Sequence, residues 1–128
     1  MLAMSKNKKV IIADDSASVQ LYYKMVFAGH NVTLLPAFNG REALDLCKKT
    51  EDIHLILLDI HMPEMDGITA LKEIRKFNKK TKIVLQTALP NPEQMEAKAE
   101  LGFNDYLEKP LDPEKVISLI SEEELIAE

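Results

Sequence analysis

LILLD, residues 55–59, is the stretch that decides the fold, because four apolar residues in a row end abruptly at a carboxylate. An apolar run of strand length without alternation is typical of a strand whose two faces are both covered by helices. The stretch VIIADD, residues 10–15, has the same character and ends in a pair of aspartates. Buried strands of this kind belong to parallel sheets, so we expect an α/β fold.

Five short, mostly apolar runs recur along the chain between longer segments of helical period. This alternation is typical of βαβ units around a parallel sheet. The first, third and fourth runs are continuously apolar, which favours a position inside the sheet. The predicted strands are Lys9–Ala13, Asn31–Leu35, Leu55–Leu58, Lys82–Gln86 and Asp105–Leu107.

A helical segment is predicted after each strand, with apolar residues at steps of three and four. The segment 91–101 is the least amphipathic, and Met95 and Ala99 are its best apolar pair. In the last segment, Asp112 is expected to cap the helix, with Pro113 as its first residue. The first predicted helix follows Ser16 and ends near Gly29, and the third follows Gly67; the second, fourth and fifth are Arg41–Lys49, Asn91–Leu101 and Asp112–Glu124. In the fifth, Val116, Leu119 and Ile120 are expected to face inward.

The size and composition of the chain predict one domain with its own core. A length of 128 residues, 46% of them hydrophobic and 29% charged, suits a single globular domain over residues 1–128. Residues 1–8 are expected to form a flexible leader. Cys47 is the only cysteine and cannot pair within the chain, which favours a reducing compartment.

The same features exclude several classes of function. The longest apolar runs fall far short of the ~18 residues that a membrane-spanning helix needs. The positive charges near the N-terminus follow the few apolar residues, the reverse of a secretory signal, so we expect a cytoplasmic protein. A net charge of −5, with no basic cluster beyond Lys6–Lys9, argues against direct binding to nucleic acid.

Polar residues stand at the predicted strand ends. Asp14-Asp15 follow the first strand, Asp59 the third, Thr87 the fourth and Lys109 the fifth. Because the carboxyl ends of parallel strands meet at one edge, these side chains are expected to share a cleft. Clustered carboxylates repel one another, and a hard cation such as Mg²⁺ relieves that repulsion. Mg²⁺ in such sites typically bridges to phosphate, so a phosphoryl group is the expected partner.

Further motifs stand in order along the chain: LLDIHMPEMDG at residues 57–67, Thr87-Ala88, Tyr106 and Lys109-Pro110. With Asp14-Asp15 they make the chain resemble a response-regulator receiver domain from residue 9 to about residue 124. The resemblance implies a doubly wound, flavodoxin-like sheet of five parallel strands in the order 2-1-3-4-5, with helices on both faces. It also implies a phosphorylatable switch of a two-component phosphorelay, in which Asp59 receives a phosphoryl group from a histidine kinase or a histidine phosphotransfer protein.

The resemblance assigns a metal site as well. It implies that Asp14 and Asp15 position Mg²⁺, and that Asp59 and the backbone carbonyl of His61 complete the protein ligands. Such a domain catalyses only its own phosphorylation and dephosphorylation and turns over no metabolite. Its expected output is contact with a downstream protein through the face made by the fourth helix, the fifth strand and the fifth helix.

The remaining roles follow from the same resemblance. Lys109 and Thr87 are implied to bind the phosphoryl group, and Tyr106 to turn inward on activation. The peptide Lys109-Pro110 is expected to be cis and to aim the ammonium group into the cleft. Gln86 departs from the family pattern, because receivers usually carry an apolar residue there; we predict no function for it.

Ordinary structural roles and two other functions remain alternatives. Alone, Asp14-Asp15 fits a helix cap, Thr87 a strand residue, Lys109 a solvated charge and Tyr106 a core residue. A Mg²⁺-dependent phosphatase of the haloacid-dehalogenase type also uses an aspartate after a strand, but that motif needs a second aspartate where this chain has His61. A flavodoxin-like cofactor binder shares the architecture, but the four glycines form no phosphate-binding loop.

Overall fold

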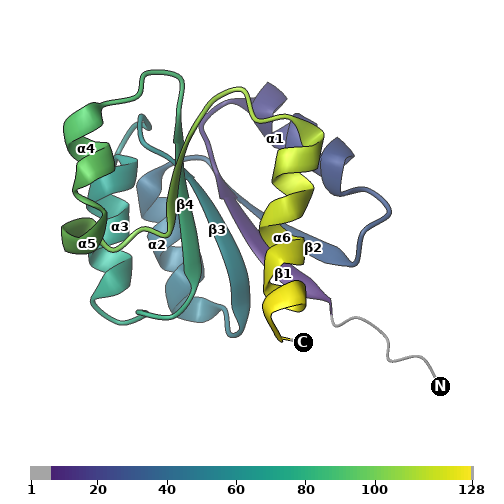
Figure 1. Ribbon diagram of the computed structural model, residues 1–128. Coiled ribbons are helices and arrows are strands. Elements are labelled where there is room, and N and C mark those ends of the chain that lie inside the picture. Colours follow the sequence, from purple (N-terminus) through teal and green to yellow (C-terminus); the bar gives the residue numbers. More distant parts are fainter. Residues whose placement is uncertain (1–6, 128) are drawn as a thin grey trace.

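The two apolar runs predicted as buried strands lie at the centre of the sheet. The computed structural model describes residues 7–127, and only the backbone of residues 122–127. Most of the predicted leader, residues 1–6, lies outside the described residues; Lys8, also assigned to the leader, is instead the first residue of a strand. The elements are β1 (Lys8–Ala13), α1 (Ala17–Phe27), β2 (Val32–Ala37), α2 (Gly40–Lys49), β3 (Ile53–Asp59), α3 (Gly67–Arg75), β4 (Lys82–Thr87), α4 (Pro92–Glu96), α5 (Lys98–Leu101), β5 (Asp105–Glu108) and α6 (Pro113–Ala127) (Figure 1).

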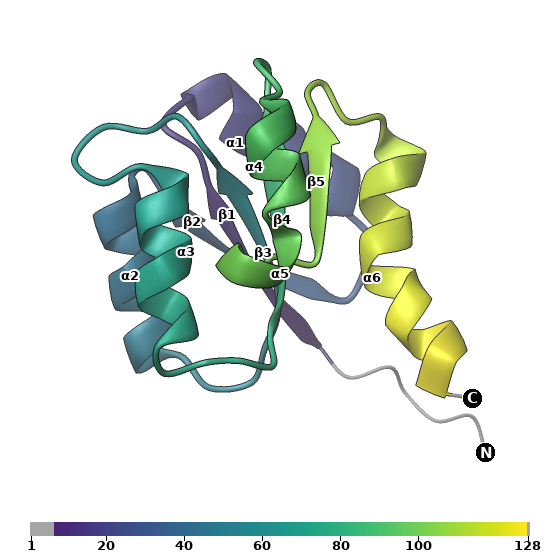
Figure 2. The ribbon, with the colours of Figure 1, turned by 60° about the vertical axis from the view of Figure 1, so that its left-hand side comes forward.

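All neighbouring strands are parallel, in the order β2-β1-β3-β4-β5. This is the predicted order, and it confirms the doubly wound α/β fold. Helices α1 and α6 cover one face of the sheet, and α2, α3, α4 and α5 lie on the other (Figures 1 and 2). Within the part of the chain that the structure describes, no helix is long and apolar enough to span a bilayer.

Two apolar clusters, one on each face, hold the helices to the sheet. Along β1, Val10 and Ile12 point toward α1 and α6, while Ile11 and Ala13 point toward α2 and α3. All four side chains are 0% exposed, because both faces of the strand are covered. The continuous apolar pattern therefore correctly indicated a strand buried on both faces.

Several strand boundaries differ from the prediction. β3 and β4 each extend to their polar residues, so Asp59 and Thr87 are the last residues of their strands. β2 is Val32–Ala37 rather than Asn31–Leu35, with Pro36 inside it. The ladder tolerates this proline because β2 is an edge strand.

The predicted helix 91–101 is wrong in one respect, since it is two short helices. The chain departs from helical geometry at Ala97 (φ −84°, ψ 21°), whose N–H donates to the carbonyl of Gln94 at 3.1 Å, one residue short of α-helical spacing. The break interrupts the period that pairs Met95 with Ala99, and both are exposed, Met95 by 45%. The best apolar pair of this weakly amphipathic segment is therefore not part of the core.

The last helix forms as predicted. The Asp112 carboxylate accepts a hydrogen bond from the N–H of Lys115 at 2.7 Å, and Pro113 is the first helical residue. Val116, Leu119 and Ile120 are buried against the sheet. α6 thereby packs on the same face as α1, beside the strand ends that carry the candidate site.

Candidate functional site

Three carboxylates meet at the carboxyl edge of the sheet. Asp14 follows β1, Asp15 follows Asp14, and Asp59 ends β3. One oxygen from each lies within 4.8 Å of the other two. Asp14 is 1% exposed and Asp59 6%, whereas Asp15 is open to solvent. The predicted convergence of these residues is confirmed by the geometry.

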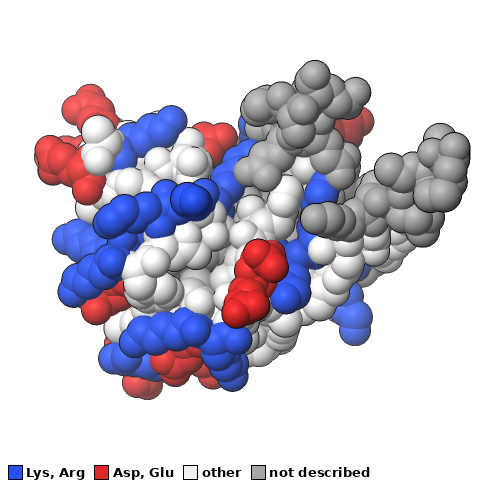
Figure 3. Space-filling view, turned by 90° about the horizontal axis from the view of Figure 1, so that it is seen from below, with Lys and Arg blue, Asp and Glu red and all other residues white. Residues whose placement is uncertain are grey.

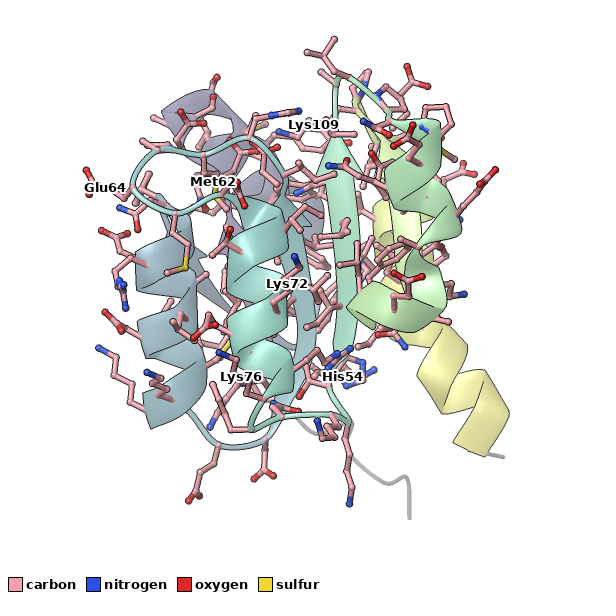
Figure 4. The ribbon with its side chains drawn as sticks, turned by 90° about the vertical axis from the view of Figure 1, so that its left-hand side faces the viewer. His54, Met62, Glu64, Lys72, Lys76 and Lys109 are labelled. Carbon is pink, nitrogen blue, oxygen red and sulfur yellow. The ribbon has the colours of Figure 1, made fainter. Side chains whose placement is uncertain are left out.

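Lys109 places its ammonium group among these carboxylates. Its Nζ atom lies 2.5 Å from Asp14 Oδ2 and 3.2 Å from Asp59 Oδ2. Figure 4 shows Lys109 at the same edge of the sheet as the β3–α3 loop, which carries Met62 and Glu64, and far from His54 at the opposite edge. The peptide Lys109-Pro110 is cis, as predicted. The Lys109 N–H also donates to the Thr87 carbonyl at 2.8 Å, which ties its loop to β4.

Burial and charge perturb both partners of this ion pair. Burial raises the pKa of Asp59, and the Asp14 charge raises it further, although Lys109 opposes both effects. Burial acts to lower the pKa of Lys109, but hydrogen bonding to Asp14 and attraction to Asp59 and Asp14 outweigh it, so this pKa is raised. Three carboxylates against one ammonium leave excess negative charge, which a bound cation would relieve.

Asp14 and Asp15 differ in how their oxygens are used. Asp14 Oδ1 accepts a hydrogen bond from the Ser16 N–H at 2.9 Å, and Oδ2 accepts from Lys109. Ser16, not either aspartate, caps α1, with its hydroxyl accepting from the Val19 N–H. No hydrogen bond or ion pair ties the Asp15 carboxylate to another described residue. Asp15 is thus the carboxylate most available to a metal, and an all-oxygen donor set fits Mg²⁺.

The loop behind Asp59 is fixed by two close backbone approaches. The Gly67 N–H donates to the Ile60 carbonyl at 2.8 Å, and the Gly40 N–H to the Met65 carbonyl at 2.9 Å. A Cβ atom at Gly67 would collide with the carbonyl of Asp59, so only glycine fits. The His61 N–H donates to Asp59 Oδ1 at 3.2 Å. His61 therefore lies at the site, and its carbonyl as a metal ligand stays a prediction.

Thr87 and Tyr106 stand apart from the carboxylates in hydrogen bonding. Thr87 is fully buried, and its hydroxyl accepts from the Leu89 N–H at 3.0 Å. The Tyr106 hydroxyl accepts from the Asn91 N–H at 3.0 Å and donates to Gln94 Oε1 at 3.1 Å. The two predicted switch residues are therefore each bound to the segment between β4 and the end of α4.

A family model described as the response regulator receiver domain matches residues 10–121. The chain is a response-regulator receiver domain. It is therefore a module of two-component signalling, in agreement with the predicted family and fold.

Individual relatives of this receiver domain are chemotaxis proteins and other regulators. The chemotaxis protein CheY of Thermotoga maritima is 34% identical over 116 residues, covering 89% of this chain and 95% of the relative. The receiver domain of the Francisella response regulator 1452 is 31% identical with a TM-score of 0.83, covering 95% of this chain and 100% of that one. The complex of CheX with CheY, BeF₃ and Mg²⁺ from Borrelia burgdorferi matches at 29% identity and a TM-score of 0.81, covering 90% and 87%.

The receiver domain also contains polar contacts that sequence reasoning missed. The hydroxyl of Tyr23 in α1 donates to Gln86 Oε1 in the core, and Gln86 Nε2 has no hydrogen-bond partner among the described residues. The amide of Gln86 at a strand end was the available signal. Gln20 donates to three backbone carbonyls around the end of β1. A single glutamine on a helix gives no sequence signal for such a role.

Proposed function

We propose that this receiver domain is a phosphorylation switch that accepts a phosphoryl group on Asp59 from a histidine kinase or a histidine phosphotransfer protein. The observation that carries the proposal is the convergence of Asp14, Asp15, Asp59 and Lys109 in one site. Mg²⁺ is proposed to bind Asp15 and Asp59 directly, Asp14 through water, and the carbonyl of His61. When bound, the cation would neutralise charge on the transferred group.

The chain's own groups would perform the transfer. A carboxylate oxygen of Asp59 attacks phosphorus; the new O–P bond forms as the N–P bond of the phosphohistidine breaks, and the electron pair leaves with the imidazole nitrogen. Lys109 Nζ lies 3.2 Å from Asp59 Oδ2, so it can donate a hydrogen bond to an oxygen of a phosphoryl group on Asp59. The Thr87 hydroxyl would donate to another oxygen once its loop moves. The domain would thus act only on itself and is proposed not to be a metabolic enzyme.

Phosphorylation by a small donor tests this function directly. The protein is incubated with acetyl phosphate, with Mg²⁺ or with EDTA, and its intact mass is recorded. We expect one added phosphoryl group in Mg²⁺ alone, mapped after borohydride reduction to the peptide that carries Asp59. Uptake that is indifferent to Mg²⁺, or mapped to another residue, contradicts the proposal.

Removing the Asp15 carboxylate should weaken Mg²⁺ binding by about tenfold or more, because a hard cation loses a direct oxygen ligand. Titration calorimetry of Asp15→Ala against the parent measures the change. Asp45→Ala is the matched control, since Asp45 is an exposed carboxylate on α2 away from the site. Equal affinities of Asp15→Ala and the parent would place the metal elsewhere.

The output surface is proposed to be α4, α5, β5 and α6, which lie side by side in Figure 2. Among the described residues of this surface, the exposed acidic side chains are Glu93, Glu96, Glu100, Glu108 and Glu114, and Lys98 is an exposed basic one. In contrast, Lys and Arg gather over the edge where the strands begin, around α2 and α3 (Figure 3). Charge complementarity therefore favours a downstream protein with a basic contact surface.

The buried, unpaired thiol of Cys47 suits the reducing cytoplasm as the proposed location.

Beryllofluoride should perturb the backbone amide signals of residues 87–111 far more than those of residues 19–28. A phosphoryl mimic at Asp59 draws Thr87 toward it and frees space for Tyr106, so the change spreads along β4, α4 and β5. Two-dimensional amide NMR with Mg²⁺, before and after addition, measures this, and Mg²⁺ alone is the control. Larger shifts along α1 would assign the output to a different face.

A further inference from the structure

Gln20 connects three segments that surround the acidic pair. It is the fourth residue of α1, and its amide nitrogen donates to the carbonyls of Ile12 at 2.9 Å, Asp14 at 3.1 Å and Ala37 at 3.0 Å. Ile12 lies in β1, Asp14 directly follows it, and Ala37 is the last residue of β2. One side chain therefore holds the start of a helix to the ends of two strands.

The chemistry of these neighbours fixes the orientation of the Gln20 amide. All three are carbonyl oxygens, which only accept hydrogen bonds, so the NH₂ group and not the amide oxygen must face them. An NH₂ group has two hydrogens, so at least one is shared between two carbonyls. Buried carbonyls at the end of a ladder need such donors. An apolar side chain at this position would leave them without this partner.

The carbonyl of Asp14 makes this contact relevant to the site, because it belongs to the peptide that joins Asp14 to Asp15. On the side-chain side, Asp14 is held by Ser16 and Lys109. On the backbone side, Gln20 holds the same peptide, and the Asp14 N–H donates to the Ala37 carbonyl at 2.9 Å. Gln20 thus restrains the short segment from which two of the three carboxylates project.

We propose that Gln20 is a positioning residue for the metal and phosphoryl site, an inference that rests on the function proposed above. It acts through the Asp14–Asp15 peptide and does not contact the metal. Mg²⁺ requires near-ideal octahedral geometry, so a small rotation of this peptide costs affinity. Groups that orient metal ligands from behind typically account for 10- to 100-fold in metal affinity.

The test compares Gln20→Met, which keeps length and helix propensity but has no donor, with Gln20→Lys, which keeps a donor. Mg²⁺ binding to the unphosphorylated protein is measured by calorimetry, and stability by urea unfolding in EDTA. We expect Gln20→Met to bind Mg²⁺ about tenfold more weakly at a temperature where it is fully folded, and Gln20→Lys to recover most of that affinity. If Gln20→Met does not fold, Gln20→Asn replaces it; its amide is one methylene too short to reach all three carbonyls.

Asn78→Ala is the matched control, because Asn78 also clamps a loop, but between the end of α3 and the start of β4, where its side chain accepts from the Thr81 N–H at 3.1 Å. This variant should lose stability without losing Mg²⁺ affinity. If Gln20→Met is less stable but binds Mg²⁺ as tightly as the parent, Gln20 has only a structural role. That result would overturn this inference and leave the proposed function unaffected. A parent domain that binds no Mg²⁺ would instead overturn the proposed function and the inference with it.

Discussion

Asp59→Asn should take up no phosphoryl group from acetyl phosphate under conditions that phosphorylate the parent protein. An amide has no ionised oxygen to attack phosphorus, and the neighbouring carboxylates cannot replace it. Asp14 is engaged on both oxygens by Ser16 and Lys109, and Asp15 is proposed to be a direct ligand of the metal. Intact-mass measurement after matched incubations reads the result. A phosphorylated Asp59→Asn protein would mean that another side chain is the acceptor.

The same variant should be more stable than the parent in EDTA. A carboxyl group whose pKa is raised on folding contributes stability below its unfolded pKa, and that contribution is lost as the pH rises through the folded pKa. At neutral pH the ionised Asp59 therefore destabilises the folded state, because burial and the charge of Asp14 disfavour its ionised form and raise its pKa. The substituted amide carries no charge, so the variant should melt at a higher temperature than the parent in EDTA. The difference between the two melting temperatures should be smaller in Mg²⁺. A lower melting temperature in EDTA would contradict this electrostatic account.

Tyr23→Phe should lower the free energy of unfolding by about 1–3 kcal/mol, because it leaves the buried Gln86 amide with no hydrogen bond at all. Burial raises the pKa of the Tyr23 hydroxyl, so it stays protonated and able to donate at neutral and mildly alkaline pH. The double variant Tyr23→Phe/Gln86→Met removes both polar groups while keeping their shapes. It should be at least as stable as the parent, since it also removes the unpaired Nε2 group.

Urea unfolding of the two single variants and the double variant gives the coupling free energy between Tyr23 and Gln86. Val84→Ala is the control, because Val84 lies on the same strand as Gln86 and in the same apolar cluster as Tyr23. It disturbs only packing, so it should show no such coupling with Tyr23→Phe. Additive effects of Tyr23→Phe and Gln86→Met would show that the hydrogen bond contributes nothing measurable.

The sheet and the acidic site could be predicted because they depend on local patterns. Two uninterrupted apolar runs indicate strands covered on both faces, and parallel strands bring their carboxyl ends to one edge. That rule alone placed Asp59 beside Asp14 and Lys109, although Asp14 and Lys109 are 95 positions apart in the sequence. The residue types at the strand ends then favoured a metal and a phosphoryl group.

Features that depend on long-range contacts could not be predicted in the same way. The bond between Tyr23 and Gln86 joins residues 63 positions apart, and neither residue specifies the other. Gln20 binds backbone carbonyls, which every residue has, so no sequence motif marks its partners. The exposure of Met95 next to the break at Ala97 could not be predicted either. Tertiary packing sets the orientation of short helices with few apolar residues.

The hydrogen bonds of the Tyr106 hydroxyl affect how often Tyr106 turns inward in the unphosphorylated domain. Its two hydrogen bonds, to the Asn91 N–H and to Gln94, hold the ring against the start of α4. At about 1 kcal/mol each, they make a spontaneous inward turn roughly 30-fold rarer than it would be without them. In the switch proposed above, the background output of an unphosphorylated population would therefore depend on Gln94 and on the Asn91 N–H, neither of which is proposed to contact the phosphoryl group. Substitutions that remove the Gln94 side-chain acceptor would raise this background without changing any group proposed to bind the phosphoryl group.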